Sequence, residues 1–455
     1  MRPDRRLLLA GIPGALLAAC SAARGPSRSS GIAPSAGASP ADHLAHAQAA
    51  ARFLRGLAVD TPHGRVWRKS PDEPGSMATD LYHGSPGPTL FLLELYRATG
   101  DRAALADALA GAAHLAATRP DKPNLGEIGL YGGAAGHTAV FAALAGATDD
   151  PRIAGWIGDA IAWLEKTAAP LPGGGVAYPA NDVLYGNGGV ILALLALDGP
   201  RARALAVRLG DGLLARAETA PHGKRWRLLP GDPTELPNFS HGTAGVAFAL
   251  ARLHEVTRDP RYLDAALAGA RHVLSLAYTD GDVCLVPHRV PDGEQRYYLG
   301  VCHGPPGTAR LFHQLAHVTG DRAWSDWFRR SVNGVLYSGI PEARTPGFWD
   351  NVGQCCGSAA VAEFMLSVHR LTGDAGYAEF ANLLADDIMR RATRRSDGSL
   401  EWIHAENRIE PYWRQSYTGY MQGASGIGSL FIRLAAHERR LGWKVRLPDN
   451  PLPIT

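Results

Sequence analysis

Three cysteines with the chemistry of metal ligands lie on two glycine-rich turns that are neighbours in a series of repeats. Cys302 lies in GVCHGPPG, and the adjacent pair Cys355 and Cys356 lies in NVGQCCGSAA. Zinc prefers thiolate ligands, and three of them leave one coordination position open for a further ligand. A thiol bound at that position would lose its proton and become a stronger nucleophile. In an oxidising compartment the same cysteines could instead form a disulfide between Cys302 and either Cys355 or Cys356.

Histidines occupy the first position of three of these turns. His83, His241 and His303 each directly precede a glycine. Imidazole titrates near neutral pH and can serve as a general acid or base, but a histidine at this position can equally cap its turn. Cys284 lies in DGDVCLVP, away from the turns, and we expect it to be buried and inert.

Seven short turns would have to position these side chains. Each turn has glycine in its second place and leads into an apolar run with helical spacing, typical of a helix buried on two sides. The turns are HGSPG (83–87), GGAAG (132–136), YGNGG (185–189), HGTAG (241–245), HGPPG (303–307), CGSAA (356–360) and QGASG (422–426).

Most of the apolar runs end in a similar stop signal, such as Thr99-Gly100-Asp101, which recurs at 319–321 and 372–374 and, as a variant, at 257–260. Glycine ends a helix because it tolerates positive φ, and aspartate caps the next helix. The next helix is more amphipathic, and a variable loop then leads to the following turn. The repeating unit is therefore a helix pair of roughly 50–65 residues.

The inner helices carry too little polar surface to leave one side exposed to solvent. We therefore predict an all-α fold, an (α/α)7 toroid, rather than an open solenoid. The apolar helices would surround an axis, the amphipathic helices would surround them, and the glycine turns would face a common cavity at one end.

The N-terminal residues are predicted to direct export. Residues 1–20 have the form of a lipoprotein-type signal peptide, in which Leu-Ala-Ala-Cys resembles a bacterial lipobox that ends at Cys20. The expected product is an exported bacterial lipoprotein, anchored by lipid on Cys20 to the outer face of the cell membrane. The pair Arg5-Arg6 is also compatible with twin-arginine export, and an ordinary signal peptide is the alternative.

The remaining chain divides into a tether and one folded domain. Residues 21–40 are rich in Ser, Ala, Gly and Pro and are predicted to be a flexible linker, whereas 41–455 form the toroid domain. The net charge of +3 on 455 residues is close to neutral, so nothing suggests nucleic acid or an acidic partner.

Seven glycine turns with cysteines on the fifth and sixth resemble the lanthionine synthetase C-like (LanC-like) family, over about residues 45–440. The resemblance implies a toroid with one zinc ion, held by Cys302 and by Cys355 and Cys356. The family's common pattern at the sixth turn is Cys-His-Gly, and Cys-Cys-Gly here resembles a subgroup with three cysteine ligands.

The resemblance also implies roles for residues beyond the metal ligands. His241 in NFSHGTAG matches the catalytic histidine, and Asp182 in NDVLYG matches the catalytic aspartate. Arg296 matches an arginine before the first cysteine, at longer spacing than usual. His303 stands where tyrosine is common, and is an additional acid, base or alternative ligand.

The expected function is that of a zinc-dependent cyclase, which adds a cysteine thiolate to a dehydrated serine or threonine of a peptide to form a thioether. Dehydration would need a separate dehydratase. Two other functions stay open: a zinc-stabilised module that binds peptides without catalysis, and a carbohydrate-active toroid. The latter needs two carboxylates across the cavity, for which the candidates are Asp80, Asp182 and Asp350. Core packing is the better expectation for Trp349, Trp402 and Trp413, although they could line a groove.

Overall fold

The computed structural model describes residues 39–197, 199–343, 351–404, 414–439 and 445–454. The predicted signal peptide, nearly all of the linker, Trp349, Asp350 and Trp413 lie outside these residues. Trp402 is buried and its indole N–H donates to the Ile388 carbonyl, so it belongs to the core. Within the described residues no helix is long and apolar enough to cross a membrane.

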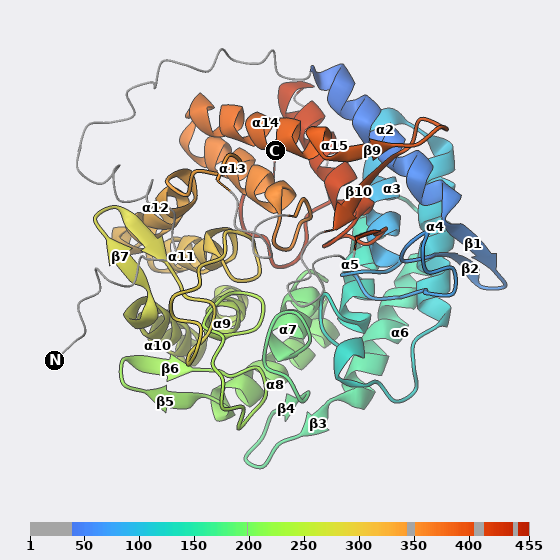
Figure 1. The fold of residues 1–455 in the computed structure, drawn as a ribbon. Helices are drawn as coiled ribbons and strands as arrows, with labels where there is room; N and C mark the ends of the chain where they lie inside the picture. Colours follow the sequence, from blue (N-terminus) through green and yellow to red (C-terminus); the bar gives the residue numbers. More distant parts are fainter. Residues whose placement is uncertain (1–38, 198, 344–350, 405–413, 440–444, 455) are drawn as a thin grey trace.

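Fourteen α-helices in this part of the chain form two concentric rings (Figure 1). Each helix of the inner ring begins at a glycine turn and is buried over most of its length. The inner helices are α3 (Pro86–Thr99), α5 (Ala134–Ala145), α7 (Asn187–Leu195), α9 (Thr243–Thr257), α11 (Pro305–Thr319), α13 (Ser358–Thr372) and α15 (Ala424–Arg439). The outer helices are α2 (Pro40–Gly56), α4 (Arg102–Ala117), α6 (Arg152–Thr167), α8 (Pro200–Ala215), α10 (Pro260–Leu276), α12 (Arg322–Leu336) and α14 (Ala375–Arg390).

The two ends of the chain close the ring. Helix α2, the first described helix, packs against α15, the last inner helix, while α15 also packs against α3. The outer partner of the seventh inner helix therefore comes from the opposite end of the sequence. The predicted toroid is confirmed, and the open solenoid is excluded.

A belt of backbone hydrogen bonds joins all seven glycine turns. The residue before each turn donates its N–H to the carbonyl of its counterpart at the next turn, at N···O distances from 2.9 to 3.4 Å, until the last donates to the first. The residues of this belt are Tyr82, Tyr131, Leu184, Ser240, Cys302, Cys355 and Met421. Because the belt is closed, the side chains that follow it share one mouth of the toroid.

The glycine in second place of each turn is required by a close backbone approach. A Cβ on Gly242 would lie 1.2 Å from the carbonyl oxygen of Leu236, six residues earlier, and Gly84 and Gly186 meet equivalent carbonyls at 2.2 Å. Each turn therefore folds back on its own chain at a distance that no side chain permits.

We expect Gly242→Ala to destabilise the protein by about 1–3 kcal/mol or more, because backbone must move to admit the methyl group. Gly155→Ala is the matched control, since a Cβ on this exposed glycine of α6 would meet nothing within 4 Å. Urea unfolding followed by circular dichroism would compare the two. Equal stabilities would contradict the assigned steric role.

The predicted stop signals are confirmed. Gly100, Gly320 and Gly373 end α3, α11 and α13 with φ of 76°, 69° and 76°. Asp101 and Asp374 then accept hydrogen bonds from backbone N–H groups in the first turns of α4 and α14. These local rules set the length of each inner helix and the start of its outer partner.

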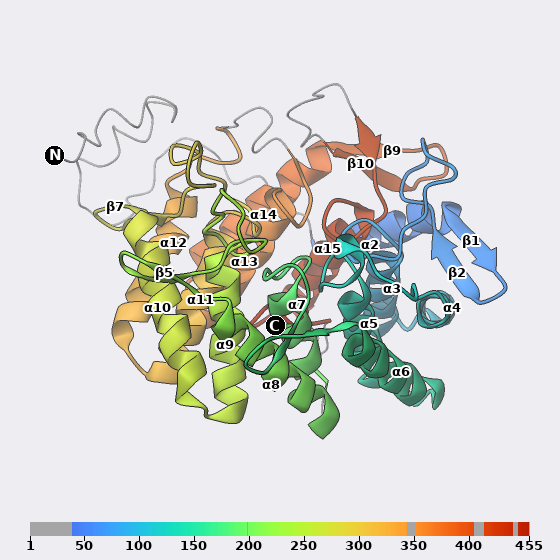
Figure 2. The same ribbon diagram turned by 90° about the horizontal axis from the view of Figure 1, so that it is seen from below.

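Short antiparallel strands occupy several of the connections for which the sequence predicted only variable loops. They follow outer helices, and β7, β9 and β10 lie near the same end of the rings in Figure 2. The pairs are β1 (Ala58–Thr61) with β2 (Gly64–Trp67), β3 (Ala169–Pro170) with β4 (Val176–Ala177), β5 (Glu218–Ala220) with β6 (Gly223–Arg225), and β7 (Tyr278–Asp280) with β8 (Val283–Leu285); β10 (Leu400–His404) pairs with both β9 (Ala392–Arg394) and β11 (Gln415–Ser416). A short 3-10 helix spans Leu125–Glu127.

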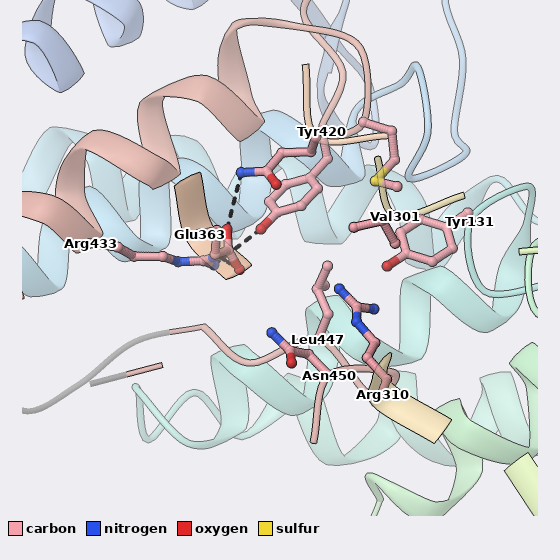
Figure 3. Close-up of a pocket in the computed structure, with 10 residues that line it drawn as sticks. Tyr131, Val301, Arg310, Glu363, Tyr420, Arg433, Leu447 and Asn450 are labelled. Carbon is pink, nitrogen blue, oxygen red and sulfur yellow. Dashed lines mark hydrogen bonds and ion pairs between the residues drawn. The ribbon is translucent and has the colours of Figure 1, made fainter. Parts of the chain in front are cut away.

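The C-terminal segment 445–454 lies against the inner ring. The Asp449 carboxylate accepts hydrogen bonds from Arg310 on α11, at 2.6 Å, and from the Tyr131 hydroxyl, at 2.8 Å. Figure 3 shows Arg310, Leu447 and Asn450 on one side of a narrow polar pocket, with Tyr420 and Glu363 on the other. The segment thus lines the same pocket as Val301 and Gln354, the residues directly before Cys302 and Cys355.

Candidate functional site

The belt places the fifth and sixth turns side by side and so brings the three cysteines together. The N–H groups of Val301 and Cys302 both donate to the carbonyl of Cys355, at 2.8 and 3.4 Å. The Cα atoms of Cys302 and Cys355 are 5.7 Å apart, and their sulfur atoms are joined as a disulfide. The Sγ of Cys356 lies 3.3 Å from the Sγ of Cys355. All three side chains are buried.

The same three residues fit a zinc ion. Their Sγ atoms lie within 4.8 Å of one another, and no other group of three or more His, Cys, Asp or Glu in the described residues is gathered in this way. Zinc–thiolate bonds of about 2.3 Å place two ligands of a tetrahedral ion about 3.8 Å apart. Reduction of the disulfide and a small separation of two sulfur atoms would therefore create the site. The sequence allowed either a zinc site or a disulfide, and the structure contains the disulfide between Cys302 and Cys355. Zinc binding by the reduced cysteines stays a prediction.

His241 and Asp182 form a pair on the neighbouring third and fourth turns. The Nδ1 of His241 lies 2.9 Å from the Oδ2 of Asp182, although the residues are 59 positions apart. The Asp182 side chain is 0% exposed and that of His241 is 19% exposed, so a buried carboxylate holds an accessible imidazole. The Oδ1 of Asp182 accepts the N–H of Tyr185 at 3.1 Å. Asp182 thus contacts both its own turn and His241, and a catalytic role for either residue stays a prediction.

His303 lies between this pair and two aromatic groups that sequence reasoning missed. Its ring centroid is 5.5 Å from that of His241, 4.6 Å from that of His288 and 5.7 Å from that of Tyr298. His288 and Tyr298 lie in the loop before the fifth turn, which has no recognisable motif. Tyr185, whose ring stacks on His241, was also missed, although it lies within the NDVLYG motif.

For the remaining candidates the structure shows contacts within their own loop or turn. Arg296 is exposed, and its backbone carbonyl accepts the N–H of His288 at 2.7 Å, so a part for its side chain stays a prediction. His83 pairs with Asp80 of its own turn, with 3.4 Å between Nδ1 and Oδ1. Burial raises the pKa of the Cys284 thiol to about 12, which fits the expected inert residue.

A closed ring of seven helix pairs, with three cysteines and a carboxylate–imidazole pair on its inner turns, defines an α/α-toroid protein with a candidate site at one mouth. The model of the lanthionine synthetase C-like protein family matches residues 75–446, and the chain belongs to this family.

Comparison with solved structures finds the same fold in nisin cyclase. Nisin cyclase is similar with a TM-score of 0.56 and 17% sequence identity, over 79% of this chain and 89% of that one. A glycoside hydrolase family 76 mannosidase from Bacteroides thetaiotaomicron gives a TM-score of 0.49 and 13% identity, over 88% and 99% of the two chains. No curated protein matches the sequence.

Proposed function

We propose that this protein is a zinc-dependent cyclase that joins a cysteine thiol to a dehydrated residue of a peptide. The observation that carries the proposal is a pair of groups on four consecutive turns of one belt: three cysteine sulfur atoms on the fifth and sixth turns, and the Asp182–His241 pair on the third and fourth. Membership of the lanthionine synthetase C-like family supports the same class of reaction.

Each participant has a distinct part in the addition. Cys302, Cys355 and Cys356 would hold the zinc ion, which would lower the pKa of a bound substrate thiol so that its proton passes to solvent. The substrate sulfur forms a bond to the β-carbon of the dehydrated residue. The electron pair of the Cα=Cβ double bond moves to the α-carbon and the adjoining carbonyl. The α-carbon then takes up a proton. His241 is the candidate proton donor, because its Nδ1 is held by the buried Asp182 carboxylate and its imidazole is partly accessible.

The proposed substrate is a peptide that carries cysteine and dehydrated serine or threonine. A separate dehydratase would form the dehydrated residues, since the assigned groups perform only the addition. We also propose that residues 1–20 direct export and lipidation at Cys20, which would place the toroid outside the cytoplasm and require the zinc site to be loaded or kept reduced there.

A second candidate function is favoured by the disulfide. With Cys302 and Cys355 oxidised, the toroid is braced at its mouth and has lost two thiolate ligands. In that state it would act as a peptide-binding module without this chemistry. The two functions differ in the redox state and metal content of one group of residues.

Metal and thiol analysis of the purified protein tests the proposal. We expect about one zinc per chain for the reduced wild type and for the control Cys284→Ala, and none retained by Cys356→Ala, which removes a ligand. Absence of zinc from the reduced wild type, with Cys302 and Cys355 rejoining as a disulfide, would refute the zinc-dependent reaction and favour the binding module.

A further inference from the structure

Tyr185 makes two contacts with the Asp182–His241 pair. Its backbone N–H donates to the Oδ1 of Asp182 at 3.1 Å, while the Oδ2 of the same carboxylate holds the Nδ1 of His241 at 2.9 Å. The phenol ring stacks on the imidazole, with centroids 5.6 Å apart and an interplanar angle of 25°. One residue therefore contacts both the carboxylate that orients the imidazole and the face of the imidazole itself.

The second turn provides a slot for this phenol ring. A Cβ on Gly132 would lie 2.7 Å from the Cδ1 of Tyr185 and 3.1 Å from its Cε1. A Cβ on Gly129 would meet the Cα of Tyr185 at 2.4 Å. At the belt, the N–H groups of Tyr131 and Gly132 both donate to the carbonyl of Leu184, which fixes the slot relative to the third turn. Gly132 thus leaves room for the aromatic ring, and Gly129 allows the backbone of Tyr185 to approach the second turn closely.

The surroundings of the phenol keep it neutral. Burial raises the pKa of Tyr185, and the carboxylates of Asp182 and Asp80 raise it further, so its hydroxyl stays protonated at neutral pH. The ring presents an uncharged plane to His241. It can restrain the rotation of the imidazole without competing for the Asp182 carboxylate.

The two restraints on His241 are complementary. The hydrogen bond from Nδ1 to Asp182 defines the tautomer and leaves Nε2 as the nitrogen for a reacting group, but it allows the imidazole plane to rotate about the bond. Stacking against Tyr185 removes that freedom. A general acid must lie within hydrogen-bond reach of the atom to which it delivers a proton, so a freely rotating imidazole would be less effective.

We propose that Tyr185, seated against Gly132, is a positioning residue that fixes the plane of the His241 imidazole. The expected effect of Tyr185 on the reaction rate rests on the proposed function, whereas its effect on the orientation of His241 does not. The arrangement of Tyr185, His241 and Asp182 is a property of the protein without substrate and can be measured alone.

Two variants of Tyr185 separate stacking from the hydroxyl group. Tyr185→Phe retains the aromatic plane, whereas Tyr185→Leu removes it at similar burial. With histidine ring nitrogens labelled with ¹⁵N, we expect a protected Nδ1–H resonance of His241 in the wild type and in Tyr185→Phe, assigned by its loss in His241→Gln. In Tyr185→Leu this resonance should broaden or disappear through exchange with water, while circular dichroism and zinc content stay as in the wild type.

Turnover of a model peptide with one cysteine and one dehydroalanine gives the second measurement. We expect kcat of Tyr185→Leu to fall by on the order of 10-fold to 100-fold with little change in KM, and Tyr185→Phe to stay near the wild type. An unchanged His241 resonance in Tyr185→Leu would overturn the proposal. If no variant forms a thioether, the cyclase function fails, while the resonance still decides the role of Tyr185.

Discussion

Replacing His241 with alanine is expected to lower the rate of thioether formation by about 10²–10⁴-fold, the usual contribution of a positioned general acid. The imidazole is the accessible member of a pair whose other member, Asp182, is completely buried. Alanine removes the proton donor and leaves the cysteines in place, so zinc content should be unchanged. The measurement is the initial rate of addition in a model peptide with one cysteine and one dehydroalanine, followed by mass spectrometry after thiol alkylation.

His83→Ala is the matched control for this experiment. His83 occupies the equivalent position of the first turn and also contacts an aspartate, but that aspartate belongs to its own turn. We expect its rate to be little changed. If His83→Ala and His241→Ala lower the rate equally, the loss would not be specific to His241, and its assignment as the proton donor would be wrong. Full activity of His241→Ala would also contradict it.

Replacing Arg433 with leucine is expected to destabilise the protein by about 3–5 kcal/mol near neutral pH, because it leaves buried carboxylates without their counter-charge. The Arg433 side chain is 2% exposed, its Nε lies 3.2 Å from the Oε1 of Glu94, and it also pairs with Glu363. Its Nη2 donates to the hydroxyl of Tyr420 and to the carbonyl of Val445, both at 3.1 Å. Figure 3 shows Arg433, Glu363 and Tyr420 of this network beside the pocket.

The loss of stability in Arg433→Leu should depend on pH. Burial raises the pKa of Glu94, and the guanidinium of Arg433 offsets part of that rise. In the variant the folded pKa rises further above the unfolded value of about 4.3, so folding takes up a proton. The penalty is therefore small below that unfolded value and grows as the pH rises through the folded pKa.

Urea unfolding at pH 5 and pH 8 measures this dependence. Arg152→Leu is the control, because Arg152 is 55% exposed and pairs with Asp150 at the surface, where loss of an ion pair costs about 1 kcal/mol or less. A loss in Arg433→Leu no larger than in this control, or one that is smaller at pH 8 than at pH 5, would contradict the assigned role.

The sequence alone predicted the elements whose causes are local. Glycine in second place of each turn, the Gly-Asp stops and the apolar inner helices follow from steric limits and capping within a few residues. The closed toroid also followed, because inner helices such as α7 and α9 have no polar face to expose. Cysteines on two consecutive turns of a ring were therefore expected to meet, since equivalent turns of neighbouring repeats lie side by side.

The strands that replaced predicted loops show the limit of local patterns. β3, β4 and β11 have two residues each, too few to show an alternation of polar and apolar side chains. Nothing in the sequence of α2 indicates that it completes the pair with α15 at the other end of the chain. Such contacts depend on where the ring closes.

The arrangement within the site was decided by the tertiary structure in the same way. The belt brings Asp182 to His241, aligns Cys302 with Cys355 rather than Cys356, and inserts Tyr185 against Gly132. Each of these contacts joins different turns, with about 50 or more residues between them. The sequence determined which chemical groups each turn presents, and the closure of the ring decided which of them touch, because only that closure sets distances between segments remote in the chain.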